Sequence, residues 1–331
     1  MSDSQAMLVE TADRLFGDLS VEQDFATLWH QIEETGFPSL LVAEDQGGFD
    51  GDWLDAVSVL RLVGFHALAA PVAESIIATW LAAKSGLPPV DGLSTIAVRH
   101  EGRLEAGRFT GQLKSVPWGR DCDHVSVFHD DRLIRLRRAE AVSILPSHSP
   151  AGESRDTLVF DAADAETAPT DADLFALGAL ARTAMIAGAL DAALARSIDY
   201  ANERVQFGKP IGKFQAVQQA LAVFAEEAAA VNCAAQAAAR AMDAGDAAFE
   251  IAAAKLRANM AAVVGVATAH QVHGAIGFTQ EYDLHRWTRR LVSWSSEFGS
   301  ERHWAEALGS QVVARGADKF WSDLTLRSDL H

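Results

Sequence analysis

The chain is poor in cysteine, in uncharged apolar runs and in positive charge, and each shortage excludes a class of protein. Its two cysteines, Cys122 and Cys233, lie far apart without metal-ligand spacing, so we expect reduced thiols and no disulfide framework. No uncharged run reaches the roughly 18 apolar residues of a membrane span. The N-terminus lacks the basic start and apolar core of a signal peptide. A soluble, cytoplasmic protein is therefore expected.

The shortage of positive charge limits the choice of partners. The net charge of −17 argues against nucleic acid or an anionic membrane surface as the main partner. It leaves room for an anionic small molecule, because a local basic site can outweigh the field of the whole protein.

What the chain has in abundance is apolar residues in helical patterns. Hydrophobic residues make up 49% of it, and alanine dominates the C-terminal half, where glycine and proline are scarce. In residues 1–91, apolar side chains recur at helical spacing, as at Phe25, Leu28, Trp29 and Ile32, and predict an N-terminal helical domain.

The pattern changes twice along the rest of the chain. Residues 92–168 carry short apolar or alternating runs separated by turn residues, which predict a small antiparallel β domain. It should end near an acidic, alanine-rich stretch at 161–173. Residues 169–331 predict long helices joined by short turns, typical of an antiparallel four-helix bundle. The expected fold is thus mainly α with a small β domain.

Two segments of the predicted bundle carry the most specific motifs, YANERVQFGKPIGKFQ at 200–215 and QVHGAIGFTQE at 271–281. Arg204 lies at the C-terminal end of a predicted helix, where a cation is favoured. Gln215 opens the next helix, where its amide is a candidate cap. Gly274 is typical of a helix C-cap. These local roles require no ligand.

Both segments resemble the C-terminal domain of the acyl-CoA dehydrogenases, flavoenzymes that place a double bond between the α and β carbons of a thioester. The order of helices, small β domain and bundle resembles that fold over the whole chain. The resemblance implies FAD as cofactor, with Arg204 reaching the flavin pyrophosphate across a subunit interface, a task that suits a guanidinium group. It implies further flavin contacts from Gln206, Phe207, Gln215, Gln271, His273, Gly274, Ala275 and Ser300. Small residues at the glycine turn permit close approach, although relatives often have a second glycine in place of Ala275.

The catalytic carboxylate of the family is missing from its usual places. A base must lie within hydrogen-bond reach of the proton that it abstracts, and the matching position is Phe298. Glu297 precedes it, but a shift of one residue turns a side chain by about 100° on a helix. Glu297 is therefore either an offset base or a structural or interface carboxylate. The family's alternative base position matches Gly178, with no acidic residue closer than Asp173.

Three functions remain open at this point. The resemblance is to the smaller subunit of paired bacterial dehydrogenases, which implies a larger homologue in a heterotetramer, an acyl-CoA substrate and an electron-transfer flavoprotein as acceptor. The chain is otherwise a self-sufficient homo-oligomer that uses Glu297, or a scaffold that binds CoA esters without oxidising them. No nucleic acid, membrane or metal is expected.

Overall fold

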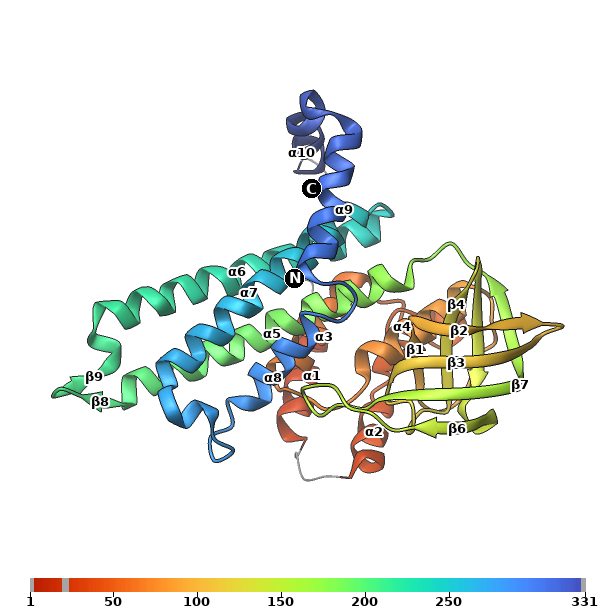
Figure 1. Cartoon of the computed structure of the whole chain (residues 1–331), viewed down its shortest axis with the longest axis horizontal. Coiled ribbons are helices and arrows are strands. Elements are labelled where there is room, and N and C mark those ends of the chain that lie inside the picture. Colours follow the sequence, from red (N-terminus) through yellow and green to blue (C-terminus); the bar gives the residue numbers. More distant parts are fainter. Residues whose placement is uncertain (1–2, 20–23, 329–331) are drawn as a thin grey trace.

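Helices occupy both ends of the chain and a curled sheet lies between them in sequence (Figure 1). The computed structural model describes residues 3–19 and 24–328. The predicted fold class, mainly α with a small β domain, is confirmed by this order of elements. The limits of the three domains stay a prediction.

Two of the N-terminal helices begin at acidic caps. Asp24 accepts a hydrogen bond from the Thr27 amide at 3.0 Å, and Asp52 and Asp55 form a reciprocal capping box. Their bounds are α1 (Asp3–Asp18), α2 (Phe25–Glu33), α3 (Trp53–Phe65) and α4 (Val72–Lys84).

The middle of the chain forms a sheet of seven strands in the order β1-β4-β5-β7-β3-β2, with β6 paired to β7. The strands are β1 (Ser94–Ala97), β2 (Arg99–Glu105), β3 (Arg108–Pro117), β4 (His124–His129), β5 (Arg132–Arg137), β6 (Ala141–Leu145) and β7 (Arg155–Pro169). Pairing is antiparallel except between β1 and β4, which are parallel. The sheet is therefore mixed rather than purely antiparallel. Strand β7 also continues through residues 161–169, where the sequence pattern places the end of the sheet.

Two long helices and a slightly shorter one form the centre of the C-terminal part, α5 (Leu174–Glu203), α6 (Gln215–Ala244) and α7 (Ala248–His273). They pack on one another, and α3 covers α5 from the N-terminal side. Two helices, Leu174–Glu203 and Ala248–Phe278, are long and apolar enough to cross a membrane by length and composition alone. In α5, 83% of the most apolar window is buried, which is the setting of a core helix.

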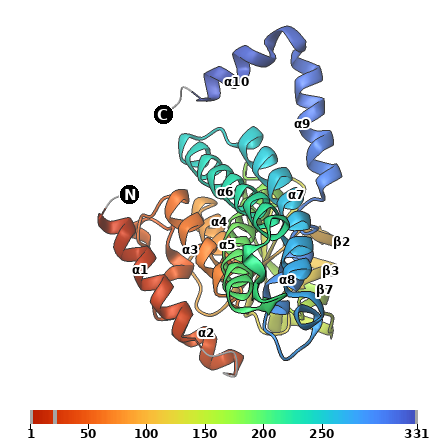
Figure 2. The same ribbon diagram turned by 90° about the vertical axis from the view of Figure 1, so that its left-hand side faces the viewer.

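The remaining α-helices and strands are β8 (Val205–Gln206), β9 (Lys209–Pro210), α8 (His285–Trp294), α9 (Glu301–Arg315) and α10 (Phe320–Ser328), and a 3-10 turn, η5 (Gly274–Phe278), follows α7. Helix α8 packs against α5 and α7, and α9 packs against α7. Beyond that contact α9 and α10 form an arm that stands away from the body in both views (Figures 1 and 2).

The close packing of α3 on α5 depends on glycine. A Cβ at Gly64 would overlap the carbonyl oxygen of Met185, and one at Gly188 would overlap that of Arg61. Each glycine thus lets the backbone of one helix touch the other.

We expect Gly188→Ala to lower the free energy of unfolding by about 1–3 kcal/mol, because the added methyl group forces the helices apart. Gly309→Ala is the matched control, since Gly309 lies in α9 with no atom within 4 Å of a Cβ placed there. It should stabilise the chain by up to about 1 kcal/mol. Urea denaturation measures both, and equal effects would contradict the close contact.

Candidate functional site

The segment between α8 and α9 carries the residues at and beside the family's base position. Phe298 and Gly299 both have positive φ, 51° and 100°, so the chain reverses sharply here. The Trp304 indole Nε1 donates to the Phe298 carbonyl at 3.0 Å, and Asn259 Nδ2 donates to the Gly299 carbonyl at 3.1 Å. These bonds fix a segment that has no regular structure of its own.

The Phe298 ring lies directly on Gly178 of α5. A Cβ at Gly178 would overlap the ring, and the ring of Phe175 packs edge-on at a centroid distance of 6.2 Å. The Arg182 guanidinium carbon lies 5.4 Å from the centre of the Phe298 ring. The two positions at which the resemblance places a base are therefore in contact with each other, and neither carries a carboxylate.

Glu297 is held by two arginines. It accepts hydrogen bonds from Arg155 Nη2 at 2.9 Å, from Arg182 Nε at 2.8 Å and from the Ser293 hydroxyl at 3.1 Å. Only 19% of its side chain is exposed. Burial alone would raise the pKa of Glu297, but the guanidinium groups of Arg182 and Arg155 outweigh it and lower the pKa to about 2. A carboxylate with both oxygens occupied and so low a pKa is a poor proton acceptor near neutral pH. This setting favours the structural role that the sequence left open.

The same two arginines extend the charge pairing into a buried network. Arg182 also pairs with Glu74 of α4, and Arg155 with Glu153 at 3.0 Å. Glu153 in turn accepts from Arg290 of α8 at 3.1 Å. Carboxylates and guanidinium groups alternate along this path, so the buried charges balance.

Lys255 of α7 is fully buried next to this network. Its ammonium group donates to Asn259 Oδ1 at 2.6 Å and to the Trp294 carbonyl at 2.9 Å. Burial, and then the Arg182 charge, lower the pKa of Lys255 to about 7. It ties α7 to the residues just before Glu297.

The sequence prediction missed Arg182, which binds Glu297, and Glu74, which pairs with Arg182. Each of the two stands as a single charge in an otherwise apolar helical run. That pattern is a readable signal, because an ionic side chain on a buried helix face needs a partner.

The predicted flavin contacts of the first motif lie at the far end of the bundle, around the hairpin β8–β9 (Figure 1). Arg204 ends α5, and no carboxylate in the described ranges 3–19 and 24–328 forms an ion pair with it. Gln206 is exposed, and Phe207 at the hairpin tip is 93% exposed. Gln215 is the first residue of α6, which has no side-chain cap among its described hydrogen bonds. The capping alternative for Gln215 is therefore not seen.

The second motif lies at the same end of the bundle. His273 stacks on Tyr200 of α5 at a centroid distance of 4.6 Å, which brings the turn η5 beside the end of α5. His273 itself is buried, and its Nδ1 donates to the Ala269 carbonyl at 2.8 Å. Gln271, Gly274 and Ala275 are exposed. Their direct contact with a flavin stays a prediction.

Ser300 is not brought to this end. It caps α9, accepting from the His303 amide at 3.3 Å, beside the Glu297 segment. Gly178 and Arg204 are 26 residues apart on or just beyond α5, or about 39 Å at the rise of an α-helix. One chain therefore places the predicted site residues in two separate groups, one at each end of α5.

The hairpin end fits the pyrophosphate of FAD. Gly274 has φ 63° and ψ −141°, a conformation suited to glycine, and no atom lies within 4 Å of a Cβ placed there. The open glycine turn lies at the same end of the bundle as Arg204, whose guanidinium group has no acidic partner among the described residues. Both features suit an anion.

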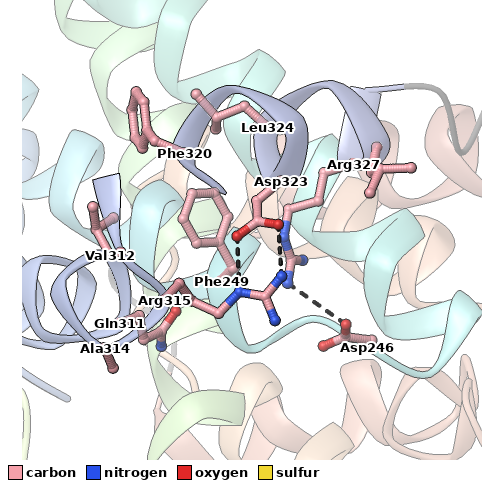
Figure 3. A pocket seen from close by; sticks show the side chains of 12 residues that line it. Asp246, Phe249, Gln311, Val312, Ala314, Arg315, Phe320, Asp323, Leu324 and Arg327 are labelled. Carbon is pink, nitrogen blue, oxygen red and sulfur yellow. Dashed lines mark hydrogen bonds and ion pairs between the residues drawn. The ribbon is translucent and has the colours of Figure 1, made fainter. Parts of the chain in front are cut away.

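A cavity of about 590 Å³ lies between the arm and the bundle and is less suited to an anion (Figure 3). Its arginines already have acidic partners: Arg315 pairs with Asp323 at 2.6 Å, and Arg327 with Asp246 at 3.6 Å (Figure 3). It offers no unpaired cation to a nucleotide.

Comparisons with known proteins agree with this arrangement. Residues 171–302 match the family model described as acyl-CoA dehydrogenase, C-terminal domain. The chain is 26% identical over 291 residues to acyl-CoA dehydrogenase IpdE2 of Mycobacterium tuberculosis, covering 86% of each. The ChsE4–ChsE5 complex of the same organism contains a chain with a TM-score of 0.83 at 22% identity, covering 94% of this chain and 97% of that one. The Tcur3481–Tcur3483 steroid ACAD gives a TM-score of 0.85 at 24% identity, covering 96% and 99%.

We expect Glu297→Gln to lower the free energy of unfolding by about 3–5 kcal/mol at pH 7, because it leaves two guanidinium groups without their shared charge. The pKa of Glu297 is about 2 in the fold, against an ordinary value of 4.5. Its stabilisation is therefore complete above pH 4.5 and is lost as the pH falls through 2, so the difference between variant and wild type should shrink over that window. Urea denaturation at a series of pH values measures this. Glu226→Gln, at an exposed position of α6, is the control, and a pH-independent difference would contradict the ion pair.

We expect Gly178→Ala to destabilise the chain by about 1–3 kcal/mol, because its methyl group overlaps the Phe298 ring. In a Phe298→Ala background the same change should be neutral or stabilising, since alanine is the better helix former. Denaturation of the two single variants and the double variant gives the coupling energy. Additive effects would show that the two positions do not touch.

Proposed function

Because this chain belongs to the acyl-CoA dehydrogenase family of FAD-dependent oxidoreductases that act on CH–CH bonds, we propose that it is the smaller subunit of a heteromeric acyl-CoA dehydrogenase. In this proposal its C-terminal residues complete a flavin site on a larger homologous chain. That larger chain supplies the flavin ring contacts and the catalytic base.

The contact between Phe298 and Gly178 carries this proposal. An aromatic ring occupies one base position and fills the space beside the other. The neighbouring Glu297 is committed to Arg155 and Arg182. A chain without a free carboxylate at this place needs a partner for proton abstraction.

The hairpin end supplies the chain's own contribution. Bound FAD provides the acceptor for the hydride that leaves the β carbon of the acyl group. Arg204 would bind the pyrophosphate through its fork of donors, and Gln206, Gln215 and Gln271 would donate or accept hydrogen bonds along the nucleotide. Gly274 and Ala275 would allow the phosphates close to the backbone. The apolar, fully exposed Phe207 would be buried against the partner.

The named relatives support a heteromer and a bulky substrate. One structural neighbour is a complex of two named chains, ChsE4 and ChsE5, and another is described as a steroid ACAD with two named components. By analogy with the second of these, we infer that the substrate of this chain is an acyl-CoA thioester whose acyl group is similar in size to a steroid. An electron transferring flavoprotein structure from Acidaminococcus fermentans also contains a chain of this fold, which supports such a protein as electron acceptor.

The test is a visible absorption spectrum with the mass in solution, first on this chain alone and then on the chain co-expressed with a larger homologue. We expect flavin only in the mixed complex, at one per two chains. One flavin per subunit and turnover by the isolated chain would instead establish a self-sufficient homo-oligomer. A colourless mixed complex would establish a scaffold.

Within the mixed complex, we expect Arg204→Ala to weaken FAD binding about 10- to 100-fold, the usual range for a hydrogen bond to a charged group. Flavin released on dilution, followed by fluorescence, measures the loss. Arg240→Ala is the control. Arg240 is also exposed, but it lies near the C-terminal end of α6, away from the hairpin. Equal retention of flavin by the two variants would exclude Arg204 from the site.

A further inference from the structure

A second cavity lies beside α8, and Arg290, the last member of the Glu297 network, lines it. It measures about 350 Å³ and forms where α1, α2 and the turn after α3 meet α8. Known ligand pockets start at roughly 300 Å³. One wall is apolar and is formed by Phe16, Leu28 and Leu68, whose side chains are buried.

The facing wall is basic. Arg286, Arg289 and Arg290 line the cavity from adjacent positions on one face of α8. Arg290 is already paired with Glu153 at 3.1 Å. Among the hydrogen bonds of the described residues, Arg286 donates to the His66 carbonyl at 3.4 Å and Arg289 to the Pro150 carbonyl at 2.7 Å.

Acidic groups among the described residues compensate the charge of Arg286 only in part. Asp283 acts to raise the pKa of Arg286, but burial and the charge of Arg290 outweigh it and lower that pKa. No carboxylate in the described parts of the chain forms an ion pair with Arg286 or Arg289. The acidic groups nearby are in use: Asp13 pairs with His66 at 2.7 Å, and Asp283 with Arg196 at 3.1 Å.

The surroundings of Arg286 disfavour the charged form of its guanidinium group. Burial, and then the like charge of Arg290, lower the pKa of Arg286. In a protein with a net charge of −17, this is a local excess of positive charge beside an apolar wall. An external anion would relieve the repulsion, and guanidinium forks bind carboxylates and phosphates in bidentate fashion.

We propose that this cleft binds an amphipathic anion, a carboxylate or phosphate head joined to an apolar chain. The head lies against Arg286 and Arg289, and the chain lies along Phe16, Leu28 and Leu68. The ligand is an amphiphile rather than a bare anion because half of the lining can only make apolar contacts. This site uses none of the predicted flavin contacts, and its test does not depend on them.

The test is calorimetric titration of the full chain with decanoate and octyl phosphate as probes, and with inorganic phosphate and 1-decanol as comparisons. We expect decanoate to bind and the shorter hexanoate and octanoate to bind more weakly, by about fourfold per methylene. Octyl phosphate that binds more tightly than decanoate would assign the head to phosphate. Binding of inorganic phosphate or 1-decanol as tight as that of decanoate would overturn the proposal.

Variants locate the site. We expect Arg286→Gln and Arg289→Gln each to weaken decanoate binding about tenfold or more. Arg99→Gln, at an exposed position of β2 far from the cleft, should bind as the wild type does. Decanoate that binds all three variants equally lies elsewhere, which overturns the assignment, as does the absence of any binding to the wild type.

Discussion

Glu297 belongs to a network of ion pairs that joins the sheet, the C-terminal bundle and the N-terminal helices. Arg155 begins the last strand of the sheet, Arg182 belongs to the central helix of the bundle, and Glu74, the other partner of Arg182, belongs to the N-terminal helices. A buried network of this kind adds little to stability compared with apolar packing, but its members tolerate few alternative arrangements. The direction in which Phe298 points follows from this pairing, because the ring is the next residue along a sharply bent segment.

The local features of this fold could be predicted from the sequence because they depend on near neighbours in the chain. The three long helices follow the spacing of their apolar residues, and Gly245 and Gly274 end two of them in backbone conformations that favour glycine. Strand β2 has no strand pattern of its own, since it is mostly exposed and its apolar residues do not alternate. The parallel pairing of β1 with β4 is likewise set by topology rather than by either segment.

Some residues of the candidate site could also be predicted from local sequence, and others could not. The hairpin and the glycine turn are local motifs, so their residues could be named in advance, and Tyr200 stacked on His273 explains why they share one end of the bundle. The partners of Glu297 lie 142 and 115 residues away in sequence, and only the folded chain brings them together. Ser300 was grouped with the hairpin residues by resemblance, yet within one chain it lies at the opposite end of α5. That separation is intelligible if the working site is assembled from two chains.

The contact of Phe298 with Gly178 also bears on how such a chain evolves. A side chain introduced at position 178 collides with the ring, and a carboxylate introduced at position 298 stands next to one whose charge is already balanced by two arginines. Either single change produces a less stable protein, so placing a base here requires at least two substitutions made together. In the proposed heteromer the ring packed on the glycine therefore acts as a ratchet, because selection on one mutation at a time meets the less stable protein first.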